Sequence, residues 1–162
     1  MKIGVYPGSF DPFTMGHLDM LLHASKLFDA VIVGVLNNSA KHPAFTVKER
    51  VEMLGRVIAE YDLKNVTVDS FDGLLVDFAR MRGAEYIIRG LRATTDFEYE
   101  FQIDATNHHL APDISTVYFM AKPALSFLSS SNVKEIAAYG GSLEGLVPDC
   151  NRKIIAERLL KA

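Results

Sequence analysis

The segment IGVYPGSFDPFTMGH, residues 3–17, joins a short apolar run to a turn rich in glycine and proline. The apolar run Ile3–Tyr6 predicts a β-strand that stops at Pro7 and Gly8. From Gly16 to Phe28, leucine and phenylalanine side chains recur close to helical spacing, which predicts the first helix. A strand that passes through a tight turn directly into a helix is typical of an α/β protein.

The rest of the chain repeats this unit. Further strands are predicted at Ala30–Leu36, Val66–Val68, Tyr86–Ile88 and Thr116–Met120. The predicted helices between and after them are Thr46–Tyr61, Leu74–Met81, Asp96–Leu110, a segment following Ser129–Ser131, and Asn151–Leu160. This alternation predicts one domain over residues 1–162, with a doubly wound, Rossmann-like, five-stranded parallel sheet and helices on both faces.

The composition excludes several classes of function. With 17 basic and 20 acidic residues, the net charge of −3 offers no broad positive field for a nucleic-acid partner. Cys150 is the only cysteine, which excludes an intrachain disulfide and a cysteine-rich metal site. We find neither a signal peptide, nor a membrane span, nor a P-loop, and therefore expect a cytoplasmic protein without a membrane partner.

The turn after the first strand is a candidate phosphate site. In an open parallel sheet, ligands bind outside the carboxyl ends of the strands. The turn opens into a helix N-terminus, whose free N–H groups attract phosphate. His17 lies in the first helical turn and would face a phosphate there, although a lone histidine could equally cap local structure. Gly16 would allow a ligand or a second backbone to approach closely.

Further cationic and hydroxyl side chains follow other strands. Arg89 and Arg92 come after the fourth predicted strand and should reach the same edge as His17. Guanidinium groups pair bidentately with phosphate, although these two could instead be solvated or paired with nearby carboxylates. Lys41 follows the second strand and could be an ordinary surface lysine. The run Ser129–Ser131 can cap a helix and cradle phosphate at the same time.

These segments resemble a known family. The sequence TMGH, Thr14–His17, resembles the (H/T)xGH signature of the nucleotidylyltransferase superfamily. The wider stretch YPGSFDPFTMGH is similar to the phosphopantetheine adenylyltransferase family of bacterial coenzyme A synthesis. The neighbourhood of Lys41–Pro43, the segment IIRGLRATTDFEYE (87–100) and the segment SFLSSSNVKE (126–135) match in the same order. The resemblance spans almost the whole chain.

The resemblance implies roles for individual residues. The implied catalytic residues are His17, Lys41 and Arg92. The implied ATP-binding residues are Ser9, Phe10, His17, Gly90, Leu91, Arg92, Glu100, Leu125, Ser126, Phe127, Leu128, Ser129, Ser130 and Ser131. The implied acceptor-binding residues are Ser9, Lys41, Leu75, Arg89 and Asn107. By spacing alone, Glu100 could be a solvated surface residue and Leu75 could belong to the core. The chain departs from the family pattern at two positions: Leu128 replaces the usual isoleucine, and Gly73 stands where some relatives carry aspartate.

The implied reaction transfers the adenylyl group of ATP to 4'-phosphopantetheine, giving dephospho-coenzyme A and pyrophosphate. The acceptor phosphate, with a second pKa of about 6, is largely dianionic at neutral pH, so it can attack directly without a general base. We expect Mg²⁺ to accompany ATP and to be held mostly by phosphate and water, since the sequence shows no cage of carboxylates. The resemblance also implies a homohexamer, and coenzyme A as a feedback inhibitor. Two alternatives stay open: a related transferase using another acceptor, such as nicotinamide mononucleotide or glycerol phosphate, and a non-catalytic nucleotide-binding module.

Overall fold

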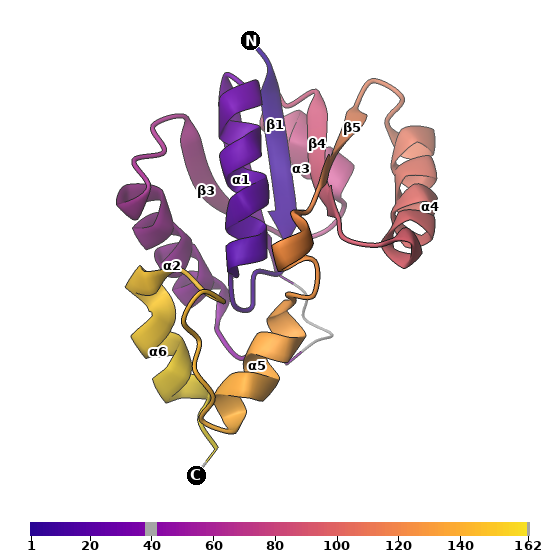
Figure 1. The fold of residues 1–162 in the computed structure, drawn as a ribbon. Helices are drawn as coiled ribbons and strands as arrows, with labels where there is room; N and C mark the ends of the chain where they lie inside the picture. Colours follow the sequence, from indigo (N-terminus) through magenta and orange to yellow (C-terminus); the bar gives the residue numbers. More distant parts are fainter. Residues whose placement is uncertain (38–41, 162) are drawn as a thin grey trace.

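The computed structural model describes residues 1–37 and 42–161 (Figure 1). Within them the strands are β1 (Ile3–Gly8), β2 (Ala30–Leu36), β3 (Val66–Phe71), β4 (Tyr86–Leu91) and β5 (Ser115–Met120). The helices are α1 (Met15–Leu27), α2 (Val47–Glu60), α3 (Leu75–Met81), α4 (Thr94–Leu110), α5 (Ser130–Ala138) and α6 (Asp149–Leu159), with a 3-10 turn, η1, at Pro123–Leu125. No helix in the described part of the chain is both long and apolar enough to cross a bilayer.

The strands form one five-stranded parallel sheet, as the sequence predicted, and the structure gives their order as β3-β2-β1-β4-β5. The chain leaves β1 in one direction to build β2 and β3, and then returns to place β4 on the other side of β1. The strand order therefore reverses between β1 and β4. In open parallel sheets this point leaves a crevice at the carboxyl ends of the two strands, where ligands bind.

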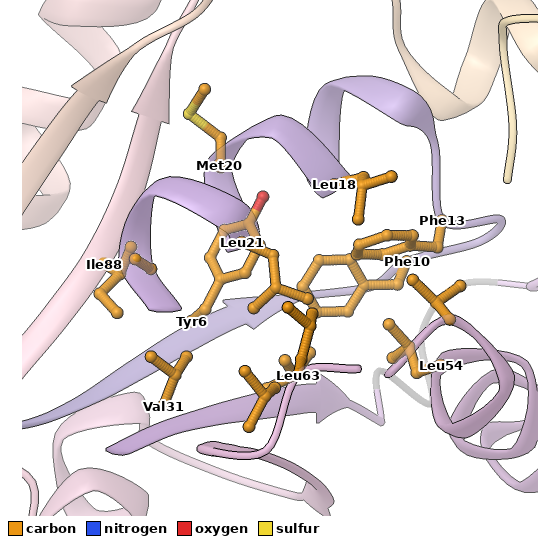
Figure 2. Packing of buried hydrophobic residues seen from close by; sticks show 14 of the residues in the cluster. Tyr6, Phe10, Phe13, Leu18, Met20, Leu21, Val31, Leu54, Leu63 and Ile88 are labelled. Atoms are coloured by element: carbon orange, nitrogen blue, oxygen red, sulfur yellow. The ribbon is translucent and has the colours of Figure 1, made fainter. Parts of the chain in front are cut away.

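Alternate residues of the central strands face opposite layers. Tyr6 and Ile88 belong to the apolar cluster under α1, whereas Val5 and Ile87 belong to the cluster that includes α3. Figure 1 shows α1 in front of the sheet and α3 behind it. Figure 2 shows Tyr6 and Ile88 gathered near Leu21 of α1. Each fully buried side chain of this size contributes about 1.5–3 kcal/mol, so the sheet is stabilised from both faces.

A third apolar cluster lies beyond the carboxyl ends of the strands. It packs α5 and α6 against α2 and includes the fully buried Val133 and Ile155 together with Met53. Asn151 on α6 adds a buried hydrogen bond from its Nδ2 to the carbonyl oxygen of Met53, at 2.9 Å. This cluster holds the start of α5 next to the crevice, below the end of β1 in Figure 1.

Several strands are longer than the sequence predicted. Pro7 and Gly8 continue β1 because they pair in register with Gly34 and Val35 of β2. Arg89 and Gly90 lie within β4 instead of following it, since Tyr118 and Phe119 of β5 pair with them. In these places, pairing with a neighbouring strand keeps residues that favour turns in the extended strand conformation. The turn η1 has no counterpart in the prediction.

Candidate active site

A cavity of about 300 Å³ lies at the carboxyl ends of β1 and β4, where the strand order reverses. Its walls come from β1, the β1–α1 turn, α1, β4, α4 and the segment after β5. The lining residues are Tyr6, Pro7, Gly8, Phe10, Thr14, Gly16, His17, Met20, Arg89, Gly90, Arg92, Glu100, Ala121, Leu125, Leu128, Ser129 and Ser130. The elements that form the crevice thus bring an imidazole, two guanidinium groups and a helix start to one small space.

The orientation of His17 is fixed by the first residue of its own capping box. Thr14 caps α1, and its Oγ1 accepts a hydrogen bond from the backbone N–H of His17 at 3.3 Å. In return, the backbone N–H of Thr14 donates to Nδ1 of His17 at 3.0 Å. Because Nδ1 accepts this hydrogen bond, the neutral ring carries its proton on Nε2. His17 therefore keeps one N–H donor available in the cavity.

The cavity also keeps this imidazole uncharged. Burial of the ring, with a smaller contribution from the positive charge of Arg92, lowers the pKa of His17 to about 4. The rings of Phe10 and Phe13 lie beside it, with centroids 5.2 and 5.4 Å from that of His17. At neutral pH the side chain is therefore a neutral hydrogen-bond donor and not a cation or a proton source.

Arg89 is held by a carboxylate inside the cavity. Its Nε and Nη2 donate to the two oxygens of Glu100 at 2.7 and 2.5 Å. Burial by itself would lower the pKa of Arg89, but the hydrogen bonds and negative charge of Glu100 raise it overall. Glu100 is 8% exposed, so it is not the solvated surface residue that its spacing allowed. One edge of the guanidinium is bound, and the group is pre-oriented for a ligand.

Arg92 connects the end of β4 to the start of α5. Its Nη1 donates to the carbonyl oxygen of Leu128 at 3.1 Å, and its Nε donates to Asp96 at 3.2 Å. Ser129 caps α5 and exchanges two hydrogen bonds with Asn132, of 2.8 and 3.2 Å. Arg92 thus has the carboxylate partner that the sequence left open and still lines the cavity, beside a capped helix N-terminus that suits phosphate.

The β1–α1 turn depends on Asp11, which is 6% exposed. Its carboxylate accepts hydrogen bonds from the backbone N–H groups of Ala44 and Phe45, both at 2.9 Å, and from Nζ of Lys134 at 3.0 Å. Ser130 adds a contact from its Oγ to the carbonyl oxygen of Pro12 at 2.8 Å. The turn is therefore attached both to the segment that leads into α2 and to the start of α5.

Arg50 of α2 secures the same turn from the other side. It is 3% exposed and donates to the carbonyl oxygens of Ser9, Leu36 and Phe45 at 2.6, 3.0 and 3.1 Å. Sequence reasoning missed both Asp11 and Arg50. A signal for Arg50 existed, because it occupies the helical stripe of the buried residues Met53, Leu54 and Val57, where a charge needs a buried partner.

The structure brings most of the residues predicted for the site together. The predicted residues that line the cavity are Phe10, His17, Arg89, Gly90, Arg92, Glu100, Leu125, Leu128, Ser129 and Ser130. Ser9 and Ser131 line a neighbouring cavity of about 260 Å³, which shares Ser130 with the first. Leu75, Leu91, Asn107, Ser126 and Phe127 line neither cavity. Lys41 lies outside the described residues, so its predicted role stays a prediction.

The positions of the predicted residues in the fold explain why some of them line neither cavity. Asn107 lies two helical turns beyond Glu100 on α4, about 10 Å along the helix axis. Leu75 packs against the apolar cluster behind the sheet, and Phe127 is 60% exposed. Conversely, Tyr6 and Met20 line the cavity without having been predicted. No chemical signal marks them, because they contribute apolar surface whose place depends on the fold.

A comparison with known proteins defines the class to which this fold and site belong. The profile of the family described as Cytidylyltransferase-like matches residues 5–136, which include most of β1, the β1–α1 turn and the start of α5. Among solved structures, a provisionally named nicotinate-nucleotide adenylyltransferase from Vibrio parahaemolyticus superposes with a TM-score of 0.70 at 17% identity. The superposition covers 98% of this chain and 95% of the other, and it establishes a shared fold.

Closer relatives define the family within this class. The phosphopantetheine adenylyltransferase of Lachnoclostridium phytofermentans is 54% identical over 158 residues, covering 98% of this chain and 96% of the relative. That of Caldanaerobacter subterraneus subsp. tengcongensis is 50% identical over 161 residues, covering 99% and 97%. The chain belongs to the phosphopantetheine adenylyltransferase family of nucleotidyltransferases.

We predict that the imidazole of His17 titrates at about pH 4 and not at its reference value of 6.5. Because the folded-state pKa is the lower one, this residue stabilises the fold above pH 6.5, and its contribution is lost as the pH falls towards 4. Nitrogen-15 NMR of the imidazoles, assigned with a His17→Ala spectrum, measures both the midpoint and the tautomer. A midpoint near 6.5, or a neutral ring protonated on Nδ1, would contradict the prediction.

We predict that Asp11→Asn lowers the free energy of unfolding by about 1–3 kcal/mol, the cost of leaving buried donors without a charged acceptor. The amide cannot accept from two backbone N–H groups and an ammonium group together. Urea denaturation measures the loss, and the exposed Asp72 supplies the control Asp72→Asn, expected to stay within about 0.5 kcal/mol of the wild type. Equal stability of both variants would show that Asp11 does not secure the turn.

Proposed function

We propose that this chain transfers the adenylyl group of ATP to 4'-phosphopantetheine, giving dephospho-coenzyme A and releasing pyrophosphate. Its family membership supports this reaction, since the relatives at 50% and 54% identity are named phosphopantetheine adenylyltransferase. The observation that carries the proposal is the cavity between β1 and β4, where His17, Arg89 and Arg92 meet. These groups suit phosphate chemistry and need no covalent intermediate.

The acceptor phosphate attacks the α-phosphorus of ATP directly, and pyrophosphate leaves on the opposite side. The acceptor's second pKa of about 6 keeps it largely dianionic at neutral pH, so no protein base removes a proton. His17 donates its Nε2–H to an α-phosphate oxygen and stabilises the charge that develops in the transition state. A neutral imidazole does this without losing its proton, which fits the low pKa that burial gives this ring.

The remaining groups position the two substrates. Arg92 and the N–H groups at the start of α5 bind the β- and γ-phosphates, where the helix N-terminus favours negative charge. Arg89, oriented by Glu100, binds the acceptor phosphate. Ser9 and Lys41 are the further groups that we assign to the nucleophilic phosphate, the assignment of Lys41 resting on the sequence alone.

Mg²⁺ enters this scheme with ATP. Magnesium keeps several water ligands and binds phosphate oxygens in preference to dedicated protein cages. Bound to the triphosphate, it would supply positive charge that stabilises the leaving pyrophosphate. Coenzyme A contains the product's adenylylated pantetheine, so we propose that it competes for the same cavity and inhibits the enzyme. We also propose that the reaction takes place in the cytoplasm.

We further propose that copies of the chain associate, as the homohexamer that the family resemblance implies. Among the described side chains of α4, only Glu100 is buried, whereas Phe97, Tyr99 and Phe101 are 52%, 64% and 62% exposed. Met120 at the end of the neighbouring β5 is 69% exposed. Large exposed apolar areas of this kind mark protein interfaces. A second copy that covers α4 and β5 would remove them from water.

Phe101→Glu tests the association, because a charge placed within an apolar interface is costly to bury. We expect the variant to elute as a smaller species in size-exclusion chromatography with light scattering. Tyr139, which is 80% exposed on another part of the surface, supplies the matched control Tyr139→Glu. A wild-type protein that is already monomeric, or a Phe101→Glu variant with unchanged mass, would overturn this part of the proposal.

A pyrophosphate-release assay with ATP and a panel of phosphate acceptors tests the reaction itself. We expect turnover with 4'-phosphopantetheine and little with nicotinamide mononucleotide or glycerol phosphate. Preference for another acceptor would support a related transferase, and ATP binding without turnover on any acceptor would support a non-catalytic module. Either result would overturn the proposal.

Within that assay, His17→Ala should lower kcat by at least about a hundredfold, the scale observed when a transition-state donor is removed. The KM for ATP should change much less, because Arg92 and the start of α5 still bind the phosphates. Lys153→Ala changes an exposed residue of α6, away from the cavity, and serves as the control. Near-normal turnover by a folded His17→Ala variant would refute the role given to this residue.

A further inference from the structure

A second buried carboxylate lies on α1, two residues after His17. Asp19 is 4% exposed, and Nζ of Lys122 lies 2.5 Å from its Oδ1. Its other oxygen, Oδ2, is buried and has no hydrogen-bond partner among the described residues. A buried charge is costly unless it is compensated. Lys122, which is itself largely exposed, supplies the compensating charge from a different part of the chain.

Lys122 stands inside the segment that forms one side of the cavity. It follows β5 and directly precedes η1, and its carbonyl oxygen accepts a hydrogen bond from the N–H of Leu125 at 2.9 Å. Its neighbour Ala121 and the following Leu125 and Leu128 line the cavity. We refer to residues 121–130 as the wall segment. A shift of Lys122 would therefore move the side of the cavity that holds apolar surface and the start of α5.

The wall segment follows an edge strand that α1 supports. Within the described sheet, β5 pairs only with β4. On the side facing α1, the ring of His23 stacks on Phe119 with centroids 5.9 Å apart, and its Nδ1 is bonded to the carbonyl oxygen of Asp19. A Cβ atom on Gly16 would lie 4.0 Å from the carbonyl oxygen of Leu125, so the wall segment passes close to the start of α1. The ion pair between Asp19 and Lys122 thus lies where a small displacement of the wall segment would change the shape of the cavity.

We propose that Asp19 and Lys122 are positioning residues that hold the wall segment against α1, and thereby set the shape of the nucleotide side of the cavity. The proposal rests on the proposed function, which assigns this side to ATP. Because Asp19 is on the same helix as His17, the ion pair fixes the wall segment relative to the proposed transition-state donor. Loss of the pair weakens ATP binding and leaves the acceptor side, around Arg89, in place.

The test compares Lys122→Met with Lys122→Arg. Methionine keeps much of the alkyl stem and removes the charge, whereas arginine restores a cation that can reach the carboxylate. We expect Lys122→Met to raise the KM for ATP about tenfold, the scale of one lost interaction of about 1.4 kcal/mol. The KM for the acceptor should change less than about twofold, since Arg89 on the acceptor side lies outside the wall segment. Lys122→Arg should return the KM for ATP to near the wild-type value.

A matched control is Lys153→Met, which breaks an exposed pair with Glu157, 3.9 Å apart, away from the cavity. Calorimetric titration with ATP measures nucleotide affinity without turnover, so a chain that fails to transfer the adenylyl group still reports on the ion pair. In that case the absence of pyrophosphate release in the wild type counts against the proposed function alone. Thermal unfolding checks each variant, and Lys122→Gln takes the place of Lys122→Met if the latter does not fold.

Three results would overturn the positioning role. These are unchanged ATP affinity in the charge-removing variant, an equal rise in the KM for ATP and for the acceptor, and failure of Lys122→Arg to recover ATP affinity. The second result would indicate general loosening of the fold. A rise confined to ATP that arginine reverses supports the proposal, because a merely structural salt bridge would not distinguish the two substrates.

Discussion

Two buried charges hold the β1–α1 turn, and the active site depends on them. A turn rich in glycine and proline has few side chains to stabilise it, and its backbone groups need partners once they are buried. The carboxylate of Asp11 accepts from two backbone N–H groups and one ammonium group, and the guanidinium of Arg50 donates to three carbonyl oxygens. Each charge is compensated by several hydrogen bonds, so its burial is tolerated. Together they hold in place the turn that leads directly into α1 and His17.

The charged groups of the cavity are oriented by contacts within the protein. Arg89 is paired with Glu100 and Arg92 with Asp96, while the imidazole of His17 stays neutral because it is buried next to a guanidinium. Donors that already have their orientation need not reorganise when charge develops on a transferring phosphoryl group. The low pKa keeps His17 a neutral donor, and the contact with Glu100 fixes the orientation of Arg89. Both effects give the cavity hydrogen-bond donors of fixed position.

The sequence was informative wherever the signal was local. Alternation of strand and helix patterns predicted the parallel sheet, and the helix predicted from Thr46 agrees with α2, which Thr46 caps with both capping hydrogen bonds present. The rule that ligands bind at the carboxyl ends of parallel strands was enough to bring His17, Arg89 and Arg92 to one edge. Phe10 and Leu125 came from the family resemblance, because apolar lining residues carry no chemical signal of their own.

The succession of strands and helices along the chain and the capping of α1 and α5 were thus determined by the sequence alone, because each depends on residues that are neighbours in the chain. The tertiary structure decided which distant groups meet. Asp11 accepts from Ala44 across 33 positions and from Lys134 across 123, and Arg50 reaches back 41 positions to Ser9. It also decided where β1 and β4 end. Pairing with β2 extends β1 over Pro7 and Gly8, and pairing with β5 extends β4 over Gly90. Such pairings depend on which elements pack together, and no local pattern of residues contains that information.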